Sequence, residues 1–435
     1  MGREDFIMKV TGIIAEYNPF HKGHKYQIDY CKKKLNSDYV IVAMSGDYVQ
    51  RGTPALLPKH VRAEMALRCG ADLVLEMPVS VSTASAEAFA MGGVSMLDGL
   101  HIVDSLCFGS EYGEVSALME LAEILVKEPE EYRQLLKEFL NNGLSFPSAR
   151  CQALTEYFKN PRNFTGDDFD GVLTPLLNQI VQILNSPNNI LGIEYCKALL
   201  RLKSSIKPVT LKRQGMGYHE TLADTATDNI PFASASAIRE LLKAALTPET
   251  ISRITAQVPD EISLLLASSL QRNEFLTEDV LDPLLSYCIL KENASGLSTY
   301  LDVSRDLAER IVNRSNEING FLQAASLLKT KEVTQTRIQR ALLHIILGIR
   351  EVPATVPYAR VLGFRKESSA LLKEIKDSSS IPLITKLADA DSLLSEAGKV
   401  LLSKTAFASN IYEKLLCQKS SRNFVHEYQK QIVIL

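Results

Sequence analysis

The chain has few cysteines for its length, no long apolar run and almost no net charge. Seven cysteines are scattered through 435 residues without a Cys-x-x-Cys spacing, which argues against a disulfide framework or a zinc site and for reduced thiols. No apolar stretch approaches the length that spans a membrane, and the first residues lack the apolar core of a signal peptide. The sequence therefore predicts a cytoplasmic protein without a membrane partner.

The net charge of -3 excludes a globally basic surface, so any contact with nucleic acid must come from local basic strings. The chain has no internal repeat and no low-complexity segment, and its length leaves room for two or three domains. The content of 46% hydrophobic residues is ordinary for a globular protein.

In the first half, short β-branched runs alternate with helical patterns. This alternation predicts an α/β fold with a Rossmann-like, doubly wound parallel sheet over residues 8–250, interrupted by a helical insertion at about 127–200. Helical spacing of apolar residues predicts a mostly α-helical domain over 251–435. The predicted strands are Lys9–Ala15, Tyr39–Met44, Asp72–Glu76, Ser105–Phe108 and Pro208–Arg213, and the helices among them are Gly23–Leu35, Lys59–Cys69, Ala84–Asp98 and Glu114–Val126.

Two histidines three residues apart follow the first predicted strand, in the string Glu16-Tyr-Asn-Pro-Phe-His-Lys-Gly-His24. A helix N-terminus is predicted there, and its free N–H groups and partial positive charge favour phosphate. His21 and His24 can donate hydrogen bonds to a phosphoryl group, and Gly23 lets the backbone come close to a nucleotide. The pair could also be metal ligands or ordinary polar surface, although a metal site would need more ligands than lie nearby. The strand–helix context favours a nucleotide-activating enzyme.

Other polar residues follow the ends of later strands, where ligands collect in parallel sheets. Gln50 and Arg51 offer donors after the second strand, or belong to a plain surface loop. Lys59 and Arg62, on one turn of a predicted helix, could hold an acidic group or form a solvated helix face. Arg213 ends the fifth strand, and its guanidinium suits a phosphate.

Two further candidate groups lie ahead of predicted helices. Asn188 and Asn189 could simply cap a helix, or they could bind an adenine edge or a ribose. Ser236 and Arg239 lie in the string Phe232-Ala-Ser-Ala-Ser-Ala-Ile-Arg239, which could bind phosphate or could be no more than a capped helix start.

In the C-terminal half, basic residues are interleaved with apolar and aromatic ones. Arg337 and Arg340 form one string, and Arg365 and Lys366 end the other, Tyr358-Ala-Arg-Val-Leu-Gly-Phe-Arg-Lys366. Such strings suit an RNA backbone and unstacked bases, although charge runs are also typical of solvated faces.

Four strings occur in an informative order: Glu-Tyr-Asn-Pro-Phe-His-Lys-Gly-His, Met-Ser-Gly-Asp-Tyr-Val-Gln-Arg-Gly, Ser-Pro-Asn-Asn-Ile-Leu-Gly and Arg-Val-Leu-Gly-Phe-Arg. With them the chain closely resembles bacterial tRNA(Met) cytidine acetate ligases, which belong to the nucleotidyltransferase superfamily with the His-x-Gly-His signature. The resemblance implies that ATP and acetate form acetyl-adenylate, and that N4 of the wobble cytidine of elongator tRNA(Met) is then acetylated. Mg²⁺ is expected with ATP, although no carboxylate cluster is visible and no protein partner is evident.

The resemblance also assigns roles to residues. His21 and His24 would be catalytic, and Arg213, Ser236 and Arg239 would hold the leaving pyrophosphate. The helical domain would bind tRNA through Arg337, Arg340, Arg365 and Lys366. The predicted ATP-binding residues are Ile14, Ala15, Glu16, Tyr17, Asn18, Pro19, Phe20, His21, Lys22, Gly23, His24, Lys25, Tyr26, Gln27, Gly109, Asn189, Arg213, Ser236 and Arg239.

Two other functions fit parts of the sequence. A small-molecule adenylyltransferase or cytidylyltransferase of cofactor or lipid synthesis would share the first domain, but would not need about 180 further residues with basic strings. A non-catalytic RNA-binding module would not need the histidine pair.

Overall fold

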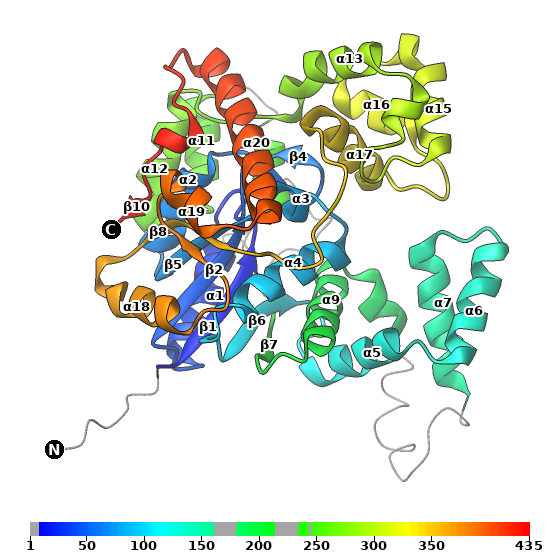
Figure 1. Ribbon diagram of the computed structural model, residues 1–435, viewed down its shortest axis with the longest axis horizontal. Coiled ribbons are helices and arrows are strands. Elements are labelled where there is room, and N and C mark those ends of the chain that lie inside the picture. The colour runs from blue at the N-terminus through cyan, green and yellow to red at the C-terminus, as the bar shows by residue number, and fades with distance from the viewer. Residues whose placement is uncertain (1–7, 161–179, 214–233, 243–245) are drawn as a thin grey trace.

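The structure is a computed structural model that describes residues 8–160, 180–213, 234–242 and 246–435. A twisted sheet forms the centre of the molecule, and two helical parts stand out from it (Figure 1). One is the hairpin of α6 (Glu130–Asn141) and α7 (Phe146–Lys159), and the other is a lobe that runs from α13 to α17.

The sheet has the strand order β10-β8-β5-β2-β1-β6-β7, and β9 pairs with β8. The five neighbouring strands β5, β2, β1, β6 and β7 are parallel, so their carboxyl ends meet at one edge of the sheet. All five were predicted from the sequence, and each observed boundary lies within two residues of the prediction. They are β1 (Val10–Ala15), β2 (Tyr39–Ser45), β5 (Leu73–Met77), β6 (Ser105–Ser110) and β7 (Lys207–Lys212).

Alternate residues of β1 enter two cores, one on each face of the sheet. Val10 and Ile14 pack with α4, α5 and α9, whereas Ile13 packs with α1, α2 and α10–α12. Helices therefore cover both faces, as a doubly wound sheet requires. These helices are α1 (Lys22–Lys33), α2 (Lys59–Arg68), α4 (Ala86–Asp98), α5 (Val115–Lys127), α9 (Pro187–Leu202), α10 (Ala235–Leu241), α11 (Pro248–Thr255) and α12 (Asp260–Gln271).

The C-terminal half is mostly helical, as the sequence predicted, but two of its strands join the central sheet. Ala359–Phe364 forms β8, which pairs antiparallel with β5 and extends the sheet, and Val433–Ile434 forms β10 beside β8. A boundary at residue 250 therefore does not separate sheet from helices. Helices make up most of the rest of this half. Ahead of β8 are α13 (Asp282–Lys291), α14 (Ala294–Leu297), α15 (Arg305–Asn313), α16 (Phe321–Leu328) and α17 (Gln335–Leu347), and between β8 and β10 are α18 (Ser369–Ser378), α19 (Ala390–Leu393) and α20 (Glu396–Ser420).

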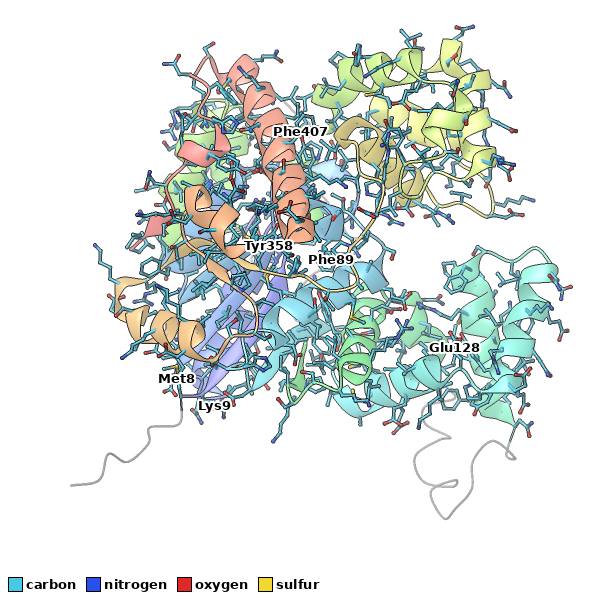
Figure 2. The ribbon with its side chains drawn as sticks, in the orientation of Figure 1. Met8, Lys9, Phe89, Glu128, Tyr358 and Phe407 are labelled. Carbon is cyan, nitrogen blue, oxygen red and sulfur yellow. The ribbon has the colours of Figure 1, made fainter. Side chains whose placement is uncertain are left out.

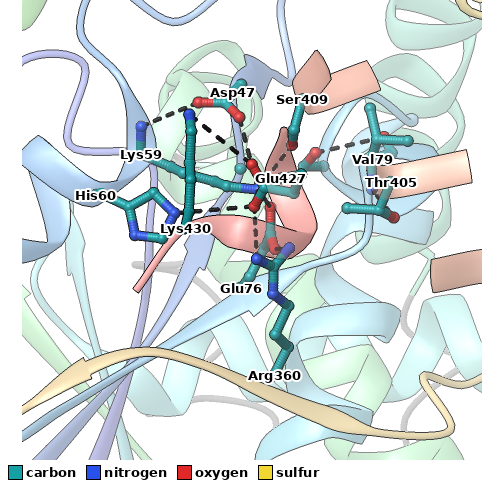
Figure 3. A network of polar contacts seen from close by, with 12 residues as sticks. Asp47, Lys59, His60, Glu76, Val79, Arg360, Thr405, Ser409, Glu427 and Lys430 are labelled. Atoms are coloured by element: carbon teal, nitrogen blue, oxygen red, sulfur yellow. Dashed lines mark hydrogen bonds and ion pairs between the residues drawn. The ribbon is translucent and has the colours of Figure 1, made fainter. Parts of the chain in front are cut away.

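A buried network of charged side chains joins these C-terminal segments to the sheet (Figure 3). Lys59 Nζ lies 2.6 Å from Glu76 Oε1 and 2.7 Å from Glu427 Oε1, and Arg360 donates to both carboxylates. All four side chains are buried. Burial raises the pKa of Glu427, but Lys59, His60 and Arg360 together hold it well below its ordinary value. The predicted solvated face at Lys59 is therefore wrong, because this residue binds acidic side chains of the protein.

Among the described helices, none combines the length and the apolar character needed to cross a membrane.

Candidate functional site

A cavity of about 310 Å³ lies at the carboxyl ends of β1, β2, β6 and β7. The loop after β1, the start of α1, the start of α9 and residues at the start of α10 also line it. This edge is where parallel sheets bind ligands, because the loops there converge from several strands. The predicted ATP-binding residues that line the cavity are Ile14, Ala15, Glu16, Tyr17, Asn18, His21, Gly23, His24, Tyr26, Gln27, Gly109, Arg213 and Arg239.

His21 and His24 stack at the N-terminus of α1, with ring centroids 3.7 Å apart. His21 is the N-cap residue, and its Nδ1 accepts a hydrogen bond from the Gly23 N–H at 3.1 Å. His24 Nδ1 accepts from the His21 N–H at 3.2 Å. Because each Nδ1 accepts, the single proton of each neutral ring is on Nε2. Each imidazole therefore has one N–H left with which to donate.

Both imidazoles are neutral at physiological pH. Burial, with the nearby positive charges of Arg213 and Arg239, lowers the pKa of His21 from 6.5 to about 3. Burial, His21 and Arg213 lower the pKa of His24 well below its ordinary value. The pair consequently offers fixed, uncharged donors at a helix N-terminus, an arrangement suited to charge that develops on a phosphoryl group.

Gly23 is required by the packing of the His21 ring. A Cβ at this position would lie 2.9 Å from Cε1 and 3.1 Å from Nδ1 of His21, closer than real Cβ contacts allow. Since Nδ1 is also the acceptor for the Gly23 N–H, the ring cannot move away without losing that bond. The glycine between the histidines thus permits the cap geometry that fixes both tautomers.

Two guanidinium groups face the same cavity. Arg213 follows β7, and its N–H donates to the Ser110 carbonyl at 3.0 Å, which anchors it beside the end of β6. Arg239 donates to the Asn18 carbonyl at 2.5 Å and to Ser236 Oγ at 3.1 Å. Ser236 therefore orients Arg239 and does not itself line the cavity. Ser234, in the same string, caps α10 and lines the cavity.

One part of the cavity lining is largely apolar. Phe89 of α4, labelled in Figure 2, lies on it with Phe108, Leu191 and Tyr195. The sequence analysis missed all four, because apolar and aromatic residues at helical or strand spacing have the same pattern whether they line a cavity or fill a core. Beside them, Gln27 donates to the Cys107 carbonyl at 2.9 Å.

The loops around the cavity are held by Arg62 and by a short hairpin. Arg62 is fully buried and donates to the main-chain carbonyls of Glu16, Ser45 and Gly46, which tie the loops after β1 and β2 together. The hairpin of β3 (Tyr48–Val49) and β4 (Thr53–Pro54) follows. Both alternatives that the sequence left for Arg62, an acidic ligand and a solvated face, are therefore wrong.

The tip of the hairpin of β3 and β4 reaches from the cavity to the lobe that runs from α13 to α17. Gln50 and Arg51 line the cavity, and the Gln50 N–H donates to Glu16 Oε1 at 2.7 Å. The next residue, Gly52, has a φ of 76°, and a Cβ there would lie 2.4 Å from the backbone nitrogen of Arg340 in α17. The reading of this string as a plain surface loop is thus wrong.

Several predicted ATP-binding residues do not line the cavity. Lys22 donates to the Ala256 carbonyl at 2.7 Å, Lys25 pairs with Glu261 on α12, and Phe20 is fully buried beside Tyr17. These three side chains of the predicted range contact other parts of the protein instead. The predicted residues outside the lining are Pro19, Phe20, Lys22, Lys25, Asn189 and Ser236.

At the start of α9, the structure places Asn188 on the cavity and the predicted ligand Asn189 away from it. Asn189 is buried, and its Oδ1 accepts from the Tyr112 N–H at 3.0 Å. Asn188 lines the cavity and donates to Glu111 Oε1 at 2.6 Å. Glu111 Oε2 also accepts from the Asn189 N–H, so this carboxylate caps α9.

The structure places the two basic strings far apart in the fold. Arg337 is exposed on α17, and Arg340 on the same helix pairs with Asp302 at 3.1 Å. The Arg365 N–H donates to the carbonyl of Asp72, just ahead of β5, so Arg365 and Lys366 lie at the sheet edge opposite the cavity. Within the described residues, no group of three or more His, Cys, Asp or Glu side chains is placed to hold a metal ion.

Known proteins share this architecture over nearly the whole chain. The family model for the HIGH Nucleotidyl Transferase matches residues 8–427. The tRNA(Met) cytidine acetate ligase of Acetivibrio thermocellus is 38% identical over 98% of this chain and 100% of its own length, and that of Clostridium tetani is 39% identical over 87% of this chain and 91% of its own.

Solved structures agree with the sequence relatives. The crystal structure of Thermotoga maritima TmcAL bound with alpha-thio ATP has a TM-score of 0.84 at 28% identity and covers 98% of this chain and 100% of its own. The structure of the same protein without ligand has a TM-score of 0.86 at 27% identity, with the same coverage. The histidine pair, the cavity at the strand ends and these relatives lead to one conclusion: the chain belongs to the tRNA(Met) cytidine acetate ligase family of HIGH nucleotidyl transferases.

Proposed function

We propose that the chain uses ATP to activate acetate as acetyl-adenylate and then acetylates N4 of the wobble cytidine of elongator tRNA(Met). The observation that carries the proposal is the pair of neutral imidazoles facing one cavity with Arg213 and Arg239. The names of the relatives support the overall reaction, and the ATP analogue bound to the Thermotoga protein supports the nucleotide.

In the first step, a carboxylate oxygen of acetate attacks the α-phosphorus of ATP, and the bond to the bridging oxygen breaks with its electron pair. The products are acetyl-adenylate and pyrophosphate. Negative charge builds on the phosphoryl oxygens as this happens, and Nε2–H groups of His21 and His24 stabilise it. Arg213 and Arg239 hold the leaving pyrophosphate, since guanidinium groups bind phosphate through paired hydrogen bonds.

The apolar wall of Phe89, Phe108 and Leu191 suits the adenine base, because nucleotide sites bury the ring against apolar side chains. Mg²⁺ enters with ATP in this proposal. The polar residues that line the cavity fit an ion held mainly by phosphate oxygens and water, which is how Mg²⁺ is commonly bound with nucleotides. The ion would supply positive charge next to the phosphates.

For the tRNA, we propose an approach along α17. The hairpin tip runs from Gln50 and Arg51 in the cavity to Gly52 against α17, and exposed Lys329, Lys331 and Arg337 lie at that end of the lobe. A basic surface that continues into a cavity suits a backbone whose terminal or looped base enters the site. The target cytidine must leave its stack for its amine to reach the acetyl group, which a single-stranded anticodon loop allows at low cost.

Mass spectrometry of the tRNA tests this function. The protein is incubated with ¹³C-labelled acetate, ATP and bulk tRNA, and the tRNA is digested with nuclease. We expect one labelled N4-acetylcytidine, from elongator tRNA(Met), only when ATP is present. Label that arrives only from acetyl-CoA contradicts the donor, and label or nucleotide transferred to a small metabolite supports the adenylyltransferase or cytidylyltransferase alternative.

A further inference from the structure

The transfer step needs a proton acceptor that the histidine pair does not provide. The exocyclic amine of cytidine is a weak nucleophile and must lose a proton as it attacks the acetyl carbon. His21 and His24 accept backbone N–H bonds at Nδ1 and carry their protons on Nε2, so they are donors toward the cavity. Burial, and then the charge of Glu16, raise the pKa of the Tyr195 hydroxyl, which therefore stays protonated.

Glu16 is the one acidic side chain among the described residues that line the cavity. It follows the last residue of β1, and Arg62 fixes its position by donating to its carbonyl oxygen. Its Oε1 accepts from the Gln50 N–H at 2.7 Å, a bond that orients the carboxylate and leaves Oε2 outside this contact. The side chain is half-buried, so the cavity can reach it.

Glu16 interacts electrostatically with residues from three other elements of the site. Its negative charge acts on Tyr195 of α9, and it also acts on Arg51 of the hairpin and on Arg239 of α10. The donors proposed for the phosphates come from other elements, namely the start of α1, the end of β7 and the last turn of α10.

We propose that Glu16 is the general base of the acetyl-transfer step, an inference that rests on the proposed function. As N4 of cytidine forms a bond to the acetyl carbonyl carbon, one N4 proton passes to the Glu16 carboxylate. The bond from that carbon to the phosphate oxygen breaks, and its electron pair leaves with AMP. The products are N4-acetylcytidine, AMP and protonated Glu16, which returns its proton to water.

The substitution Glu16→Gln separates this role from the others. The amide oxygen still accepts from the Gln50 N–H, but the side chain no longer takes up a proton. Three rates are measured: acetate-dependent exchange of pyrophosphate into ATP without tRNA, formation of acetohydroxamate with hydroxylamine, and single-turnover acetylation of tRNA. Hydroxylamine is a strong nucleophile that attacks acetyl-adenylate without a general base. We expect tRNA acetylation to fall about a hundredfold or more, the usual contribution of a general base, and to fall at least about tenfold more than either of the other two rates.

Glu278→Gln is the matched control, because Glu278 also acts electrostatically on Arg51 and Arg239 but does not line the cavity. We expect all three rates to be unchanged in it. Equal losses of all three rates in Glu16→Gln would overturn the inference and assign Glu16 to ATP or Mg²⁺ binding. Normal tRNA acetylation in that variant would also overturn it. A wild-type protein that makes no N4-acetylcytidine would instead overturn the proposed function itself, before any variant is made.

Discussion

Each imidazole of the histidine pair accepts a hydrogen bond from one backbone N–H, and burial keeps each ring neutral. Nδ1 of His21 and of His24 accept from Gly23 and His21, respectively, so both rings donate from Nε2. A neutral donor adds no cation that would titrate near pH 7, so the donors keep the same charge across the physiological pH range. The exact positions of these rings therefore matter more than their charge.

Gly23→Ala tests this positioning. The new Cβ would lie 2.9 Å from Cε1 of His21 and displace the ring. We expect acetate activation to slow about tenfold or more, because a small displacement of a catalytic group is costly, with circular dichroism unchanged. Gly398→Ala in α20 is the control, since a Cβ there has only ordinary contacts at 3.4 Å and longer. Wild-type rates in Gly23→Ala would show that the cap geometry is not needed.

The depressed pKa of His21 predicts a pH-dependent stability. Folded His21 has a pKa of about 3 against 6.5 for the ordinary group, so below pH 6.5 the unfolded chain binds a proton that the folded chain does not. This contribution to the free energy of unfolding is present above pH 6.5 and is lost as the pH falls toward 3. Between pH 7 and pH 5 the loss is about 2 kcal/mol.

The variant His21→Asn measures that loss, because asparagine can accept the Gly23 N–H at the N-cap but does not titrate. Urea midpoints at pH 7 and pH 5 should fall more in the wild type than in this variant. Parallel losses would contradict a buried, neutral His21.

Sequence reasoning located the histidine pair because its members are close in the chain and its chemistry depends on one strand–helix junction. It did not separate Asn188 from Asn189, since both lie in the first turn of the same helix. The difference depends on Glu111 and Tyr112, which come from the end of β6 and are 77 residues distant. Contacts between residues so far apart in the chain leave no local pattern in the sequence.

At the scale of elements, the parallel strands were predictable because β-branched runs such as Val40–Val42 are buried on both faces. β8 was not, because its segment carries Arg360 within an apolar run and lies among helices in the sequence. The buried carboxylates of Glu76 and Glu427 make that arginine compatible with a sheet interior. Arg360, which the sequence alone would place at the surface, is thus part of the core.

Arg360→Met should destabilise the fold. It leaves Glu76 and Glu427 buried with Lys59 near both carboxylates and with Lys430 3.9 Å from Glu427 (Figure 3), and breaking such a buried pair costs about 3–5 kcal/mol. We expect a lower urea midpoint for unfolding. Lys366→Met, an exposed change just beyond the same strand, is the control and should shift the free energy of unfolding by no more than about 0.5 kcal/mol. Equal midpoints for the two variants would contradict a structural role for the network.

At the scale of the whole molecule, the C-terminal half both completes the sheet and carries the lobe beside the cavity. β8 and β10 join the sheet next to β5, while α17 packs against the hairpin that lines the cavity. The sequence suggested two successive domains because helical spacing dominates after residue 250. The return of the chain to the sheet depends on pairing between segments almost 300 residues apart, which periodicity does not record.

The RNA path along α17 predicts unequal effects of two charge reversals. Lys331→Glu with Arg337→Glu should weaken tRNA binding about tenfold or more and reduce its dependence on salt, with ATP affinity unchanged. Both residues are exposed, whereas Arg340 is avoided because it pairs with Asp302. Arg365→Glu with Lys366→Glu, at the opposite sheet edge, should have the smaller effect. A filter-binding titration in which only the second pair matters would contradict this path.

The central claim is that the histidine pair activates acetate with ATP before tRNA takes part. Acetate-dependent exchange of labelled pyrophosphate into ATP, in the absence of tRNA, measures that step alone. The account predicts exchange in the wild type and a loss of at least about a hundredfold in His21→Ala and in His24→Ala, the scale for removing a preorganised donor. Exchange that needs no acetate, or that survives at the wild-type rate in both variants, would contradict it.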